Sequence, residues 1–353
     1  MRDLLLVGSV PLITAEQVMT RCAHTFGEHL SALPDGEIGD RRYWVTRMHF
    51  RVFNGHQDID TVQRPRPDLG VERLIPHGIE DIWKFRVKAG VEQVNFGEPG
   101  ARLGYAQDAI ASYSIFRALK KDGVIPSAMR FQVGMPLPVS AVSHINWVEP
   151  TDVHKVRPGF TRAMQAEIDA MLAVIPPEQL AIQWEAVWEL GDVYGHFPYL
   201  APAGALERNL EQIRALAPRL PAAVQLGYHL CFGTFGHWPR IESADLGPAV
   251  ALGNAMIEAS GRRVDWLHLP ATASLDPAYY APLADLAARG ARVYLGLIHN
   301  MSSFAERLAL ARRYLRDFGI SAYCGFGRLS DAELDRVMRD HLDALAVMAH
   351  VSA

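Results

Sequence analysis

The stretch Ala223-Val-Gln-Leu-Gly-Tyr-His-Leu230 is a short apolar run typical of a buried strand, and a longer stretch with helical spacing follows it. Similar runs rich in Val, Leu and Ile recur along the chain, and helical stretches separate nearly all of them. This alternation is the signature of a mostly parallel sheet. The expected strands are Leu4–Gly8, Leu30–Leu33, Met129–Gly134, Leu180–Trp184, Ala223–Leu230, Val264–Leu267, Arg292–Ile298 and Ile320–Tyr323.

Capping-box patterns mark three helix starts. In each, a Ser or Thr is followed three residues later by Gln or Glu, so the two side chains can cap each other's backbone N–H groups. The pairs are Thr14 with Gln17, Ser303 with Glu306, and Ser330 with Glu333.

Eight β/α units in about 250 residues form a closed (β/α)8 TIM barrel. We therefore expect residues 1–353 to form a single α/β TIM-barrel domain, with the extra length in loops and an insertion after the second β/α unit. An open doubly wound sheet is the main alternative. Against it, no Gly-x-Gly-x-x-Gly motif follows the first run, where Val7-Gly8-Ser9-Val10-Pro11 stands.

The expected insertion covers residues 54–100. Proline and glycine punctuate this segment too densely for a continuous barrel helix. The turn-forming stretches are Arg64-Pro65-Arg66-Pro67, Pro76-His77-Gly78 and Glu98-Pro99-Gly100.

Composition excludes several classes of protein. The 35 Lys and Arg against 39 Asp and Glu give a formal charge of −4, which offers no basic field for a nucleic acid. No stretch approaches the roughly 20 apolar residues of a membrane span. Residues 1–9 contain too short an apolar run for a secretory signal. The three cysteines are too few for a disulfide framework. We expect a soluble cytoplasmic protein with reduced thiols.

In TIM barrels the catalytic groups lie at the carboxyl ends of the strands. His229 and Cys231 are two residues apart at the end of one expected strand, so their side chains point the same way. His268 and Cys324 stand at the ends of two other strands. Two imidazoles and two thiolates suit tetrahedral Zn²⁺, whose charge the thiolates balance. These four residues are the expected metal ligands.

Packing is the alternative reading for each cysteine alone, because free cysteine often fills a core as a small apolar side chain. We assign Cys22, on the expected first helix, to packing. Ser9, Glu37 and Glu185 also follow apolar runs, so they face the expected barrel mouth, although Ser9 and Glu37 could each be purely structural. A carboxylate such as Glu185 there requires a partner or an ammonium-bearing ligand.

Strand-end motifs appear in a consistent order along nearly the whole chain: Gly8-Ser9-Val10-Pro11, Gly36-Glu37, Ile182-Gln183-Trp184-Glu185, His229-x-Cys231, Ile298-His299 and Cys324-Gly325. In this respect the sequence resembles the catalytic C-terminal half of cobalamin-independent methionine synthase and its shorter relatives, within the group that includes uroporphyrinogen decarboxylase. The resemblance implies zinc ligation by His229, Cys231 and Cys324.

The same resemblance implies that Ser9, Glu37 and Glu185 hold the amino-acid part of a thiol substrate and that His299 shuttles a proton. Two departures concern the site: His268 stands where the family has a zinc-ligating glutamate, and Glu185 replaces an aspartate. The folate-binding N-terminal half of the long enzymes has no counterpart here, so the resemblance does not carry the methyl donor.

Three functions follow as hypotheses. The first is zinc-dependent methyl or alkyl transfer to a small-molecule thiol from an alkyl donor, with His299 and Glu185 as catalytic residues. The second is a zinc lyase or hydrolase, because His268 in place of a glutamate makes the ion more electrophilic. The third is a metal-free binding or decarboxylase-like barrel, although no arginine cluster is evident at the strand ends. The oligomeric state is open, a homodimer being one option.

Overall fold

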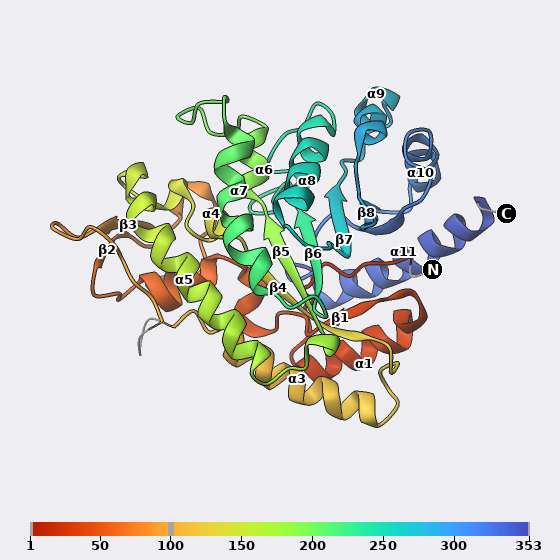
Figure 1. Cartoon of the computed structure of the whole chain (residues 1–353), viewed down its shortest axis with the longest axis horizontal. Helices are drawn as coiled ribbons and strands as arrows, with labels where there is room; N and C mark the ends of the chain where they lie inside the picture. Colours follow the sequence, from red (N-terminus) through yellow and green to blue (C-terminus); the bar gives the residue numbers. More distant parts are fainter. Residues whose placement is uncertain (1–2, 98–101, 352–353) are drawn as a thin grey trace.

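The computed structural model describes residues 3–97 and 102–351 and has an α/β fold built on one curled parallel sheet (Figure 1). Seven strands form this half-barrel in the order β1-β4-β5-β6-β7-β8-β9. Each strand lies within a residue or a few of an apolar run identified in the sequence. The strands are β1 (Ala32–Pro34), β4 (Arg130–Pro136), β5 (Leu180–Ala186), β6 (Gln225–Leu230), β7 (Trp266–Pro270), β8 (Arg292–Ile298) and β9 (Gly319–Ala322).

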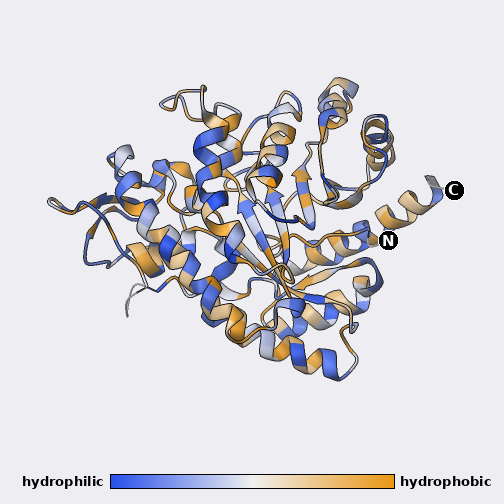
Figure 2. Ribbon diagram, in the orientation of Figure 1, coloured by the Kyte–Doolittle hydropathy of each residue, from blue (hydrophilic) through white to orange (hydrophobic). Residues whose placement is uncertain are grey.

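The helices lie around the sheet, as the alternating pattern predicts (Figure 1), and in Figure 2 the long outer ones carry both polar and apolar residues. They are α1 (Ala15–Phe26), α2 (Thr46–Met48), α3 (Tyr105–Lys121), α4 (Pro138–Ala141), α5 (Val153–Leu172), α6 (Trp188–Val193), α7 (Ala205–Leu216), α8 (Gly247–Ala259), α9 (Pro277–Tyr280), α10 (Phe304–Arg312) and α11 (Asp331–Val351). Among the described residues, none of these helices is both long and apolar enough to cross a membrane.

The three expected helix starts are confirmed, but only one capping box is complete. Thr14 and Gln17 cap each other's backbone at the start of α1. At α11 the Glu333 carboxylate accepts from the backbone N–H of Ser330 at 2.8 Å. Ser303 precedes α10 with φ 55°, and in this left-handed conformation its side chain makes no capping hydrogen bond.

The first expected strand, Leu4–Gly8, is not one of the seven strands. Only Leu4 forms a bridge, to Ile320 of β9. Side chains take over part of the backbone pairing: the Gln132 amide donates to the carbonyls of residues 6 and 7 at 3.0 Å, and the Gln183 amide donates to the carbonyl of residue 7 at 2.6 Å. These amides bond carbonyls that a regular ladder would pair with a neighbouring strand, and the described residues form seven regular strands in this sheet rather than the expected eight.

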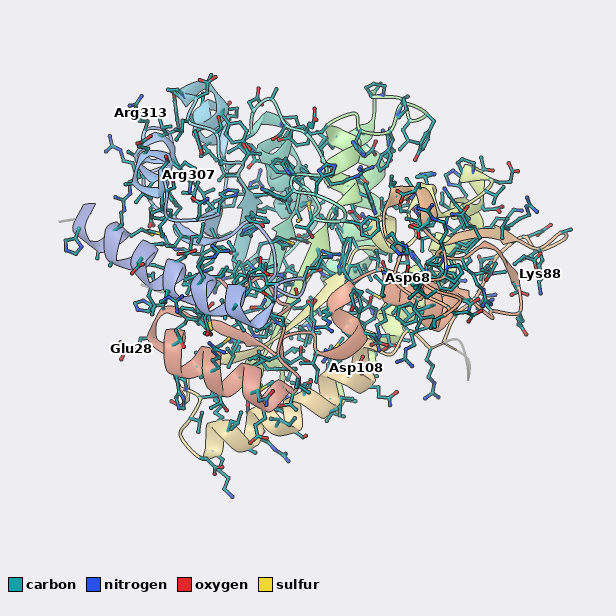
Figure 3. All side chains as sticks on the ribbon, turned by 180° about the vertical axis from the view of Figure 1, so that it is seen from behind. Glu28, Asp68, Lys88, Asp108, Arg307 and Arg313 are labelled. Atoms are coloured by element: carbon teal, nitrogen blue, oxygen red, sulfur yellow. The ribbon has the colours of Figure 1, made fainter. Side chains whose placement is uncertain are left out.

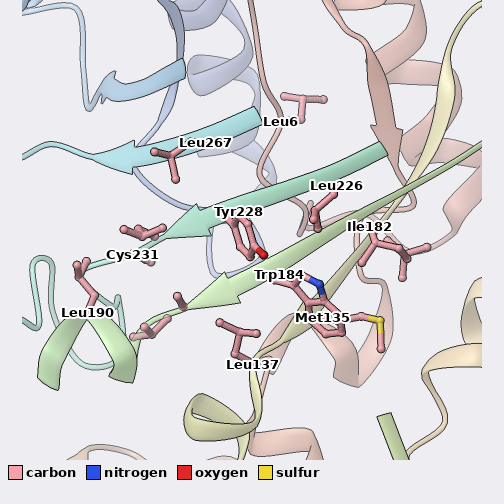
Figure 4. Packing of buried hydrophobic residues seen from close by; sticks show 14 of the residues in the cluster. Leu6, Met135, Leu137, Ile182, Trp184, Leu190, Leu226, Tyr228, Cys231 and Leu267 are labelled. Atoms are coloured by element: carbon pink, nitrogen blue, oxygen red, sulfur yellow. The ribbon is translucent and has the colours of Figure 1, made fainter. Parts of the chain in front are cut away.

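Side chains on the concave side of the sheet form layers, as in a barrel interior. A small apolar cluster comprises Leu5, Ala32, Ala181, Trp266 and Tyr294. Next toward the carboxyl ends come Gln132 and Gln183, and the Trp266 indole N–H donates to Gln183 at 3.3 Å. On the other face, alternate residues of β5 and β6 pack in the main core (Figure 4). On this side of the sheet, apolar side chains therefore give way to polar ones toward the carboxyl ends of the strands.

The expected insertion contains an antiparallel pair, β2 (Ile59–Gln63) and β3 (Lys84–Val87), which forms a second sheet. It projects from one side of the molecule in Figure 1, and Figure 3 shows Lys88 at its outer part. Phe85 of β3 packs against Phe53 and Trp147, with ring centroids 5.6 and 5.8 Å away. The last part of the expected insertion, residues 98–100, lies outside the described residues. The division into domains stays a prediction.

Candidate metal centre and substrate cavity

Strand register brings the predicted site residues to one level of the sheet. Glu185 on β5 is paired with His229 on β6, and His229 is paired with His268 on β7. Since side chains alternate across a strand, these three share the concave side with Gln183. Cys231 follows β6 directly (Figure 4), and its N–H donates to the carbonyl of Ala186 at 3.1 Å. The pairing of the parallel strands therefore places these side chains at one level on one side of the sheet.

His229, Cys231 and Cys324 converge on one point. One potential ligand atom from each lies within 4.8 Å of the other two. The two sulfurs are 3.5 Å apart, with the Cys231 thiol donating to Cys324. Two sulfurs held about 2.3 Å from a tetrahedral ion stand roughly 3.8 Å apart, so this spacing fits a shared ion after a small adjustment. It is much longer than the roughly 2.05 Å of a disulfide.

His268 lies behind His229 rather than within that group. Its Nδ1 is 2.8 Å from Nδ1 of His229, and its Nε2 is 3.1 Å from the carbonyl oxygen of Ala322. A carbonyl only accepts, so Nε2 of His268 carries the proton and its Nδ1 accepts from His229. Nε2 of His229 is then the unprotonated nitrogen. The hydrogen bonds thus set the tautomer in which His229 can ligate a metal, and both nitrogens of His268 are engaged.

The charge on the thiol pair is uneven. The hydrogen bond from Cys231 holds the pKa of Cys324 well below its usual range, while the same bond and burial raise the pKa of Cys231. The Cys231 sulfur also accepts from the N–H of Gly233 at 3.3 Å. Burial lowers the pKa of His268, so its imidazole is neutral. The centre is therefore rich in electron-pair donors.

Two carboxylates meet beside this centre. Oε1 of Glu37 and Oε1 of Glu185 both lie 2.8 Å from the point where a Cβ on Gly134 would stand. Burial and then Asp35 raise the pKa of Glu37 to about 8, and burial and then Glu37 raise the pKa of Glu185. Like charges in a buried pair oppose each other's ionisation, so the pair favours a shared proton or a bound cation.

Ser9 joins the end of the first segment to the loop that carries Cys324. Its hydroxyl accepts from the N–H of Gly327 at 3.1 Å, and its carbonyl accepts from the N–H of Phe326 at 2.7 Å. A Cβ on Gly325 would lie 2.3 Å from the Ser9 hydroxyl oxygen, so this approach requires glycine. The Gly-Ser turn therefore has a structural role besides facing the site.

These groups open into one cavity of about 110 Å³, lined by Ser9, Glu37, Glu185, His229, Cys231 and Cys324. For comparison, a cavity of about 150 Å³ encloses a benzene molecule, so the site suits a small ligand. Aromatic and aliphatic side chains form its walls, among them Tyr43, Trp44, Ile145, Val187, Trp188 and Phe235. The cavity thus combines a polar end with apolar walls, as ligand sites commonly do.

Sequence reasoning missed most of the residues that line this cavity, including all its arginines. Arg42, Arg240 and Arg328 line it, and none forms an ion pair with a carboxylate among the described residues. Arg42 lies in the short 3-10 helix Gly39–Tyr43, and Arg240 and Arg328 lie in irregular segments, so no long periodicity signals the direction of these side chains. His49 also lines the cavity, at the start of a π-helical turn over His49–Phe53, and a π-turn often marks a functional site.

His299 lies outside this set of lining residues. Its Nε2 is 2.7 Å from the carbonyl oxygen of Ala271, and its ring stacks on Tyr323 with centroids 4.9 Å apart. Burial, then Arg307, lowers the pKa of His299 to about 4. The His299 ring is therefore neutral at pH 7, and Tyr323, the residue before Cys324, covers one of its faces. Cys22 lies in the main core, as expected for a packing residue.

The sequence matches no known family profile, and none of the curated proteins is detectably similar to it. Solved structures do resemble the fold. One is a B12-independent methionine synthase from Shewanella sp. W3-18-1 in complex with selenomethionine, with a TM-score of 0.61 and 14% identity over 99% of this chain and 97% of that one. Another is a putative vitamin-B12 independent methionine synthase from Listeria monocytogenes, with a TM-score of 0.55 and 14% identity over 98% and 96%. At this identity the likeness establishes the fold.

Proposed function

We propose that this protein is a zinc-dependent alkyltransferase, in its simplest form a methyltransferase, that acts on a small thiol bearing an amino group. The observation that carries the proposal is the convergence of His229, Cys231 and Cys324 beside the buried pair Glu37 and Glu185. The likeness to methionine synthase structures, one of them a complex with selenomethionine, supports it.

The donor set suits zinc in particular. One imidazole nitrogen and two sulfurs are ligands that zinc prefers, and three protein ligands leave a fourth position for a substrate. Bound zinc would lower the pKa of a thiol and so supply a thiolate at neutral pH. We assign ligation to Nε2 of His229 and the sulfurs of Cys231 and Cys324. For His268 we propose support of His229, in place of the ligand role that its sequence position suggested.

Glu37 and Glu185 would hold the ammonium group of the substrate. A buried acid pair is unfavourable when both members are ionised, and a cation between them offsets that repulsion. Arg41 is not the cation that neutralises this acid pair, because its guanidinium donates to Asp35 at 2.7 Å. Ser9, beside the same end of the cavity, would orient the rest of the amino-acid group. This arrangement positions a thiol side chain toward the sulfurs.

Proton transfer is assigned to His299, as the resemblance implies. With Nε2 donating to Ala271, Nδ1 keeps its lone pair and can accept a proton. Its stacking on Tyr323 sets it beside the metal loop rather than in the cavity. A rearrangement of Tyr323 would therefore accompany access to substrate.

We further infer that Leu4–Gly8 occupies the position of a first barrel strand, because it lies next to β9 through the Leu4–Ile320 bridge. Residues 1–353 would then form one barrel domain, with residues 54–100 as an insertion. This proposal explains why Ser9 stands near Cys324, the two ends of the chain being adjacent in the ring.

Two measurements test the function. Purified protein should contain one zinc per chain, and L-homocysteine should slow removal of that zinc by a chelator while L-homoserine, which lacks the thiol, should not. Methyl transfer is then measured by incubating the protein and the thiol with each of a panel of methyl donors and detecting the methylated thiol by mass spectrometry. Stoichiometric zinc that homocysteine does not protect would overturn thiol alkylation while leaving the metal site intact.

A further inference from the structure

A second cavity, of about 470 Å³, lies among the helices outside the metal centre. Helices α4, α5, α6 and α7 contribute its walls. Trp188 lines both this cavity and the one at the metal centre, so the two are neighbours. The proposed metal ligands do not line it. We call it the helical cavity.

Three buried polar atoms in the helical cavity have no hydrogen-bond partner within the described part of the chain. They are Oγ of Ser143, Nη2 of Arg157 and Oδ1 of Asn209. More than nine-tenths of buried polar groups in folded proteins are hydrogen-bonded, so three exceptions in one cavity require an explanation. Each of the three has almost no surface that a water molecule can reach, so a ligand in the cavity reaches this donor, hydroxyl and acceptor only after small side-chain rotations.

Arg157 is the most informative of the three. Its Nε donates to the carbonyl of Val142 at 3.1 Å, and it forms no ion pair with a described carboxylate. Burial lowers its pKa to about 10, which leaves it cationic at neutral pH. Arg157 as a whole is partly exposed, but its Nη2 is buried without a partner, and proteins normally pair such a cationic group or use it to bind an anion.

The nearby acids are already engaged. The Asp192 carboxylate accepts from Nε and Nη2 of Arg208 at 2.6 and 2.5 Å and from the amide of Asn209 at 2.8 Å. The Glu189 carboxylate accepts from the backbone N–H of Ser140 at 3.1 Å and from Gln212 at 2.9 Å. Both acids contribute a favourable field at Arg157 without contacting it. The guanidinium therefore keeps a free donor edge.

The other lining residues indicate which chemical groups a ligand would carry besides its anionic group. Pro138, Phe197 and Leu200 give apolar contacts, and burial followed by Arg157 lowers the pKa of His144 to about 4, so this lining ring is neutral. The lining residue His154 is exposed, as is Glu211, which supplies a negative charge at the rim. An apolar body with one anionic group facing Arg157 matches this distribution.

We propose that the helical cavity binds a small organic oxyanion, a carboxylate or phosphate monoester on an apolar body that also carries a hydrogen-bond donor. The oxyanion accepts from Nη2 of Arg157 and from the Ser143 hydroxyl, and the donor reaches Oδ1 of Asn209. Guanidinium is well suited to both oxyanions. The site is separate from the alkyl-transfer centre and does not depend on a metal there.

Calorimetric titration of the full-length protein with 4-hydroxybenzoate and with 4-hydroxyphenyl phosphate tests this site and distinguishes the two anions. At least one should bind saturably with one site per chain. The neutral isostere 4-hydroxybenzamide should bind at least tenfold more weakly than 4-hydroxybenzoate. Arg157→Gln should raise the Kd of the bound anion at least tenfold, or about 1.4 kcal/mol, and Ser143→Ala should raise it by a smaller factor.

Arg240→Gln is the matched control, since this arginine lines the metal-centre cavity but not the helical cavity. It should leave the Kd within twofold. Circular dichroism melting checks the fold of each variant, and zinc content, unchanged in Arg157→Gln, separates this site from the proposed function. Equal Kd values for wild type and Arg157→Gln, or no saturable binding of either anion up to about 10 mM, would overturn the proposal.

Discussion

Replacing His268 by leucine tests how the metal centre is built. The substitution removes the acceptor of the 2.8 Å hydrogen bond from His229 and the donor to Ala322, at a side chain that is fully buried. Leucine fills a similar space, so loss of packing is minor. What changes is the tautomer of His229, because its Nδ1 proton has lost its partner.

The expected magnitude follows from that supporting role. Removing a group that orients a metal-ligating histidine typically weakens metal binding 10- to 100-fold, about 1.4 to 2.8 kcal/mol. His268→Leu should therefore still bind one zinc, with a Kd raised by that factor. His229→Ala removes a ligand itself and should bind zinc much more weakly than His268→Leu.

Competition with a chromophoric zinc chelator, at pH 7.5 under reducing conditions, measures both Kd values. Cys22→Ala is the matched control, since it removes a buried thiol remote from the centre and should leave the Kd unchanged. If His268→Leu bound zinc as poorly as His229→Ala, His268 would be a ligand and the assignment of roles would be wrong. A Kd equal to that of the wild type would show that the hydrogen bond does not orient His229.

Three further predictions concern other parts of the molecule. Gly134→Ala places a Cβ 2.8 Å from Oε1 of both Glu37 and Glu185, so calorimetry should show at least tenfold weaker binding of L-homocysteine with unchanged zinc content, and unchanged binding would contradict the role of the acid pair. Burial lowers the pKa of His341 to about 4, against about 6.5 when unfolded, so its neutral form stabilises the fold above pH 6.5 and this contribution is lost as the pH falls toward 4. In urea unfolding, His341→Phe should therefore lose about 2 kcal/mol less than the wild type between pH 8 and pH 5, whereas parallel pH profiles would refute this. Burial raises the pKa of Cys22 to about 12, so a thiol reagent should modify it only after unfolding, and rapid modification of three thiols in the native protein would be inconsistent with its packing.

Most of the sheet could be predicted because its strands are buried on both sides and read as continuous apolar runs. Residues 180–184 and 292–298 illustrate this, and both lie within observed strands. Leu4–Gly8 has the same local pattern, yet the amides of Gln132 and Gln183 bond its carbonyls. Such long-range side-chain contacts leave no mark on the local periodicity.

The convergence of His229, Cys231 and Cys324 was predictable for the same geometric reason. Residues two apart on a strand share a face, and the carboxyl ends of parallel strands lie together, which joins Cys324 to His229 and Cys231. The same logic could not show that His268 lies behind His229 rather than beside the two sulfurs. His268 is directly in register with His229, whereas Cys231 lies two residues further along, and only the register reveals that difference in level.

The cavity walls were not predictable. The arginines that line it come from loops and one short 3-10 helix, where side-chain direction depends on how the segments pack rather than on a long helix or strand period. Arg328 illustrates this, since it reaches the hydroxyl of Thr234 on another loop.

X-ray absorption at the zinc edge measures directly whether His229, Cys231 and Cys324 bind one ion. We expect two sulfurs and one nitrogen from the protein without substrate, a third sulfur when L-homocysteine is added, and one sulfur fewer in Cys324→Ala. A zinc environment that keeps its sulfur count in Cys324→Ala, or protein that binds no zinc under reducing conditions, would contradict this expectation.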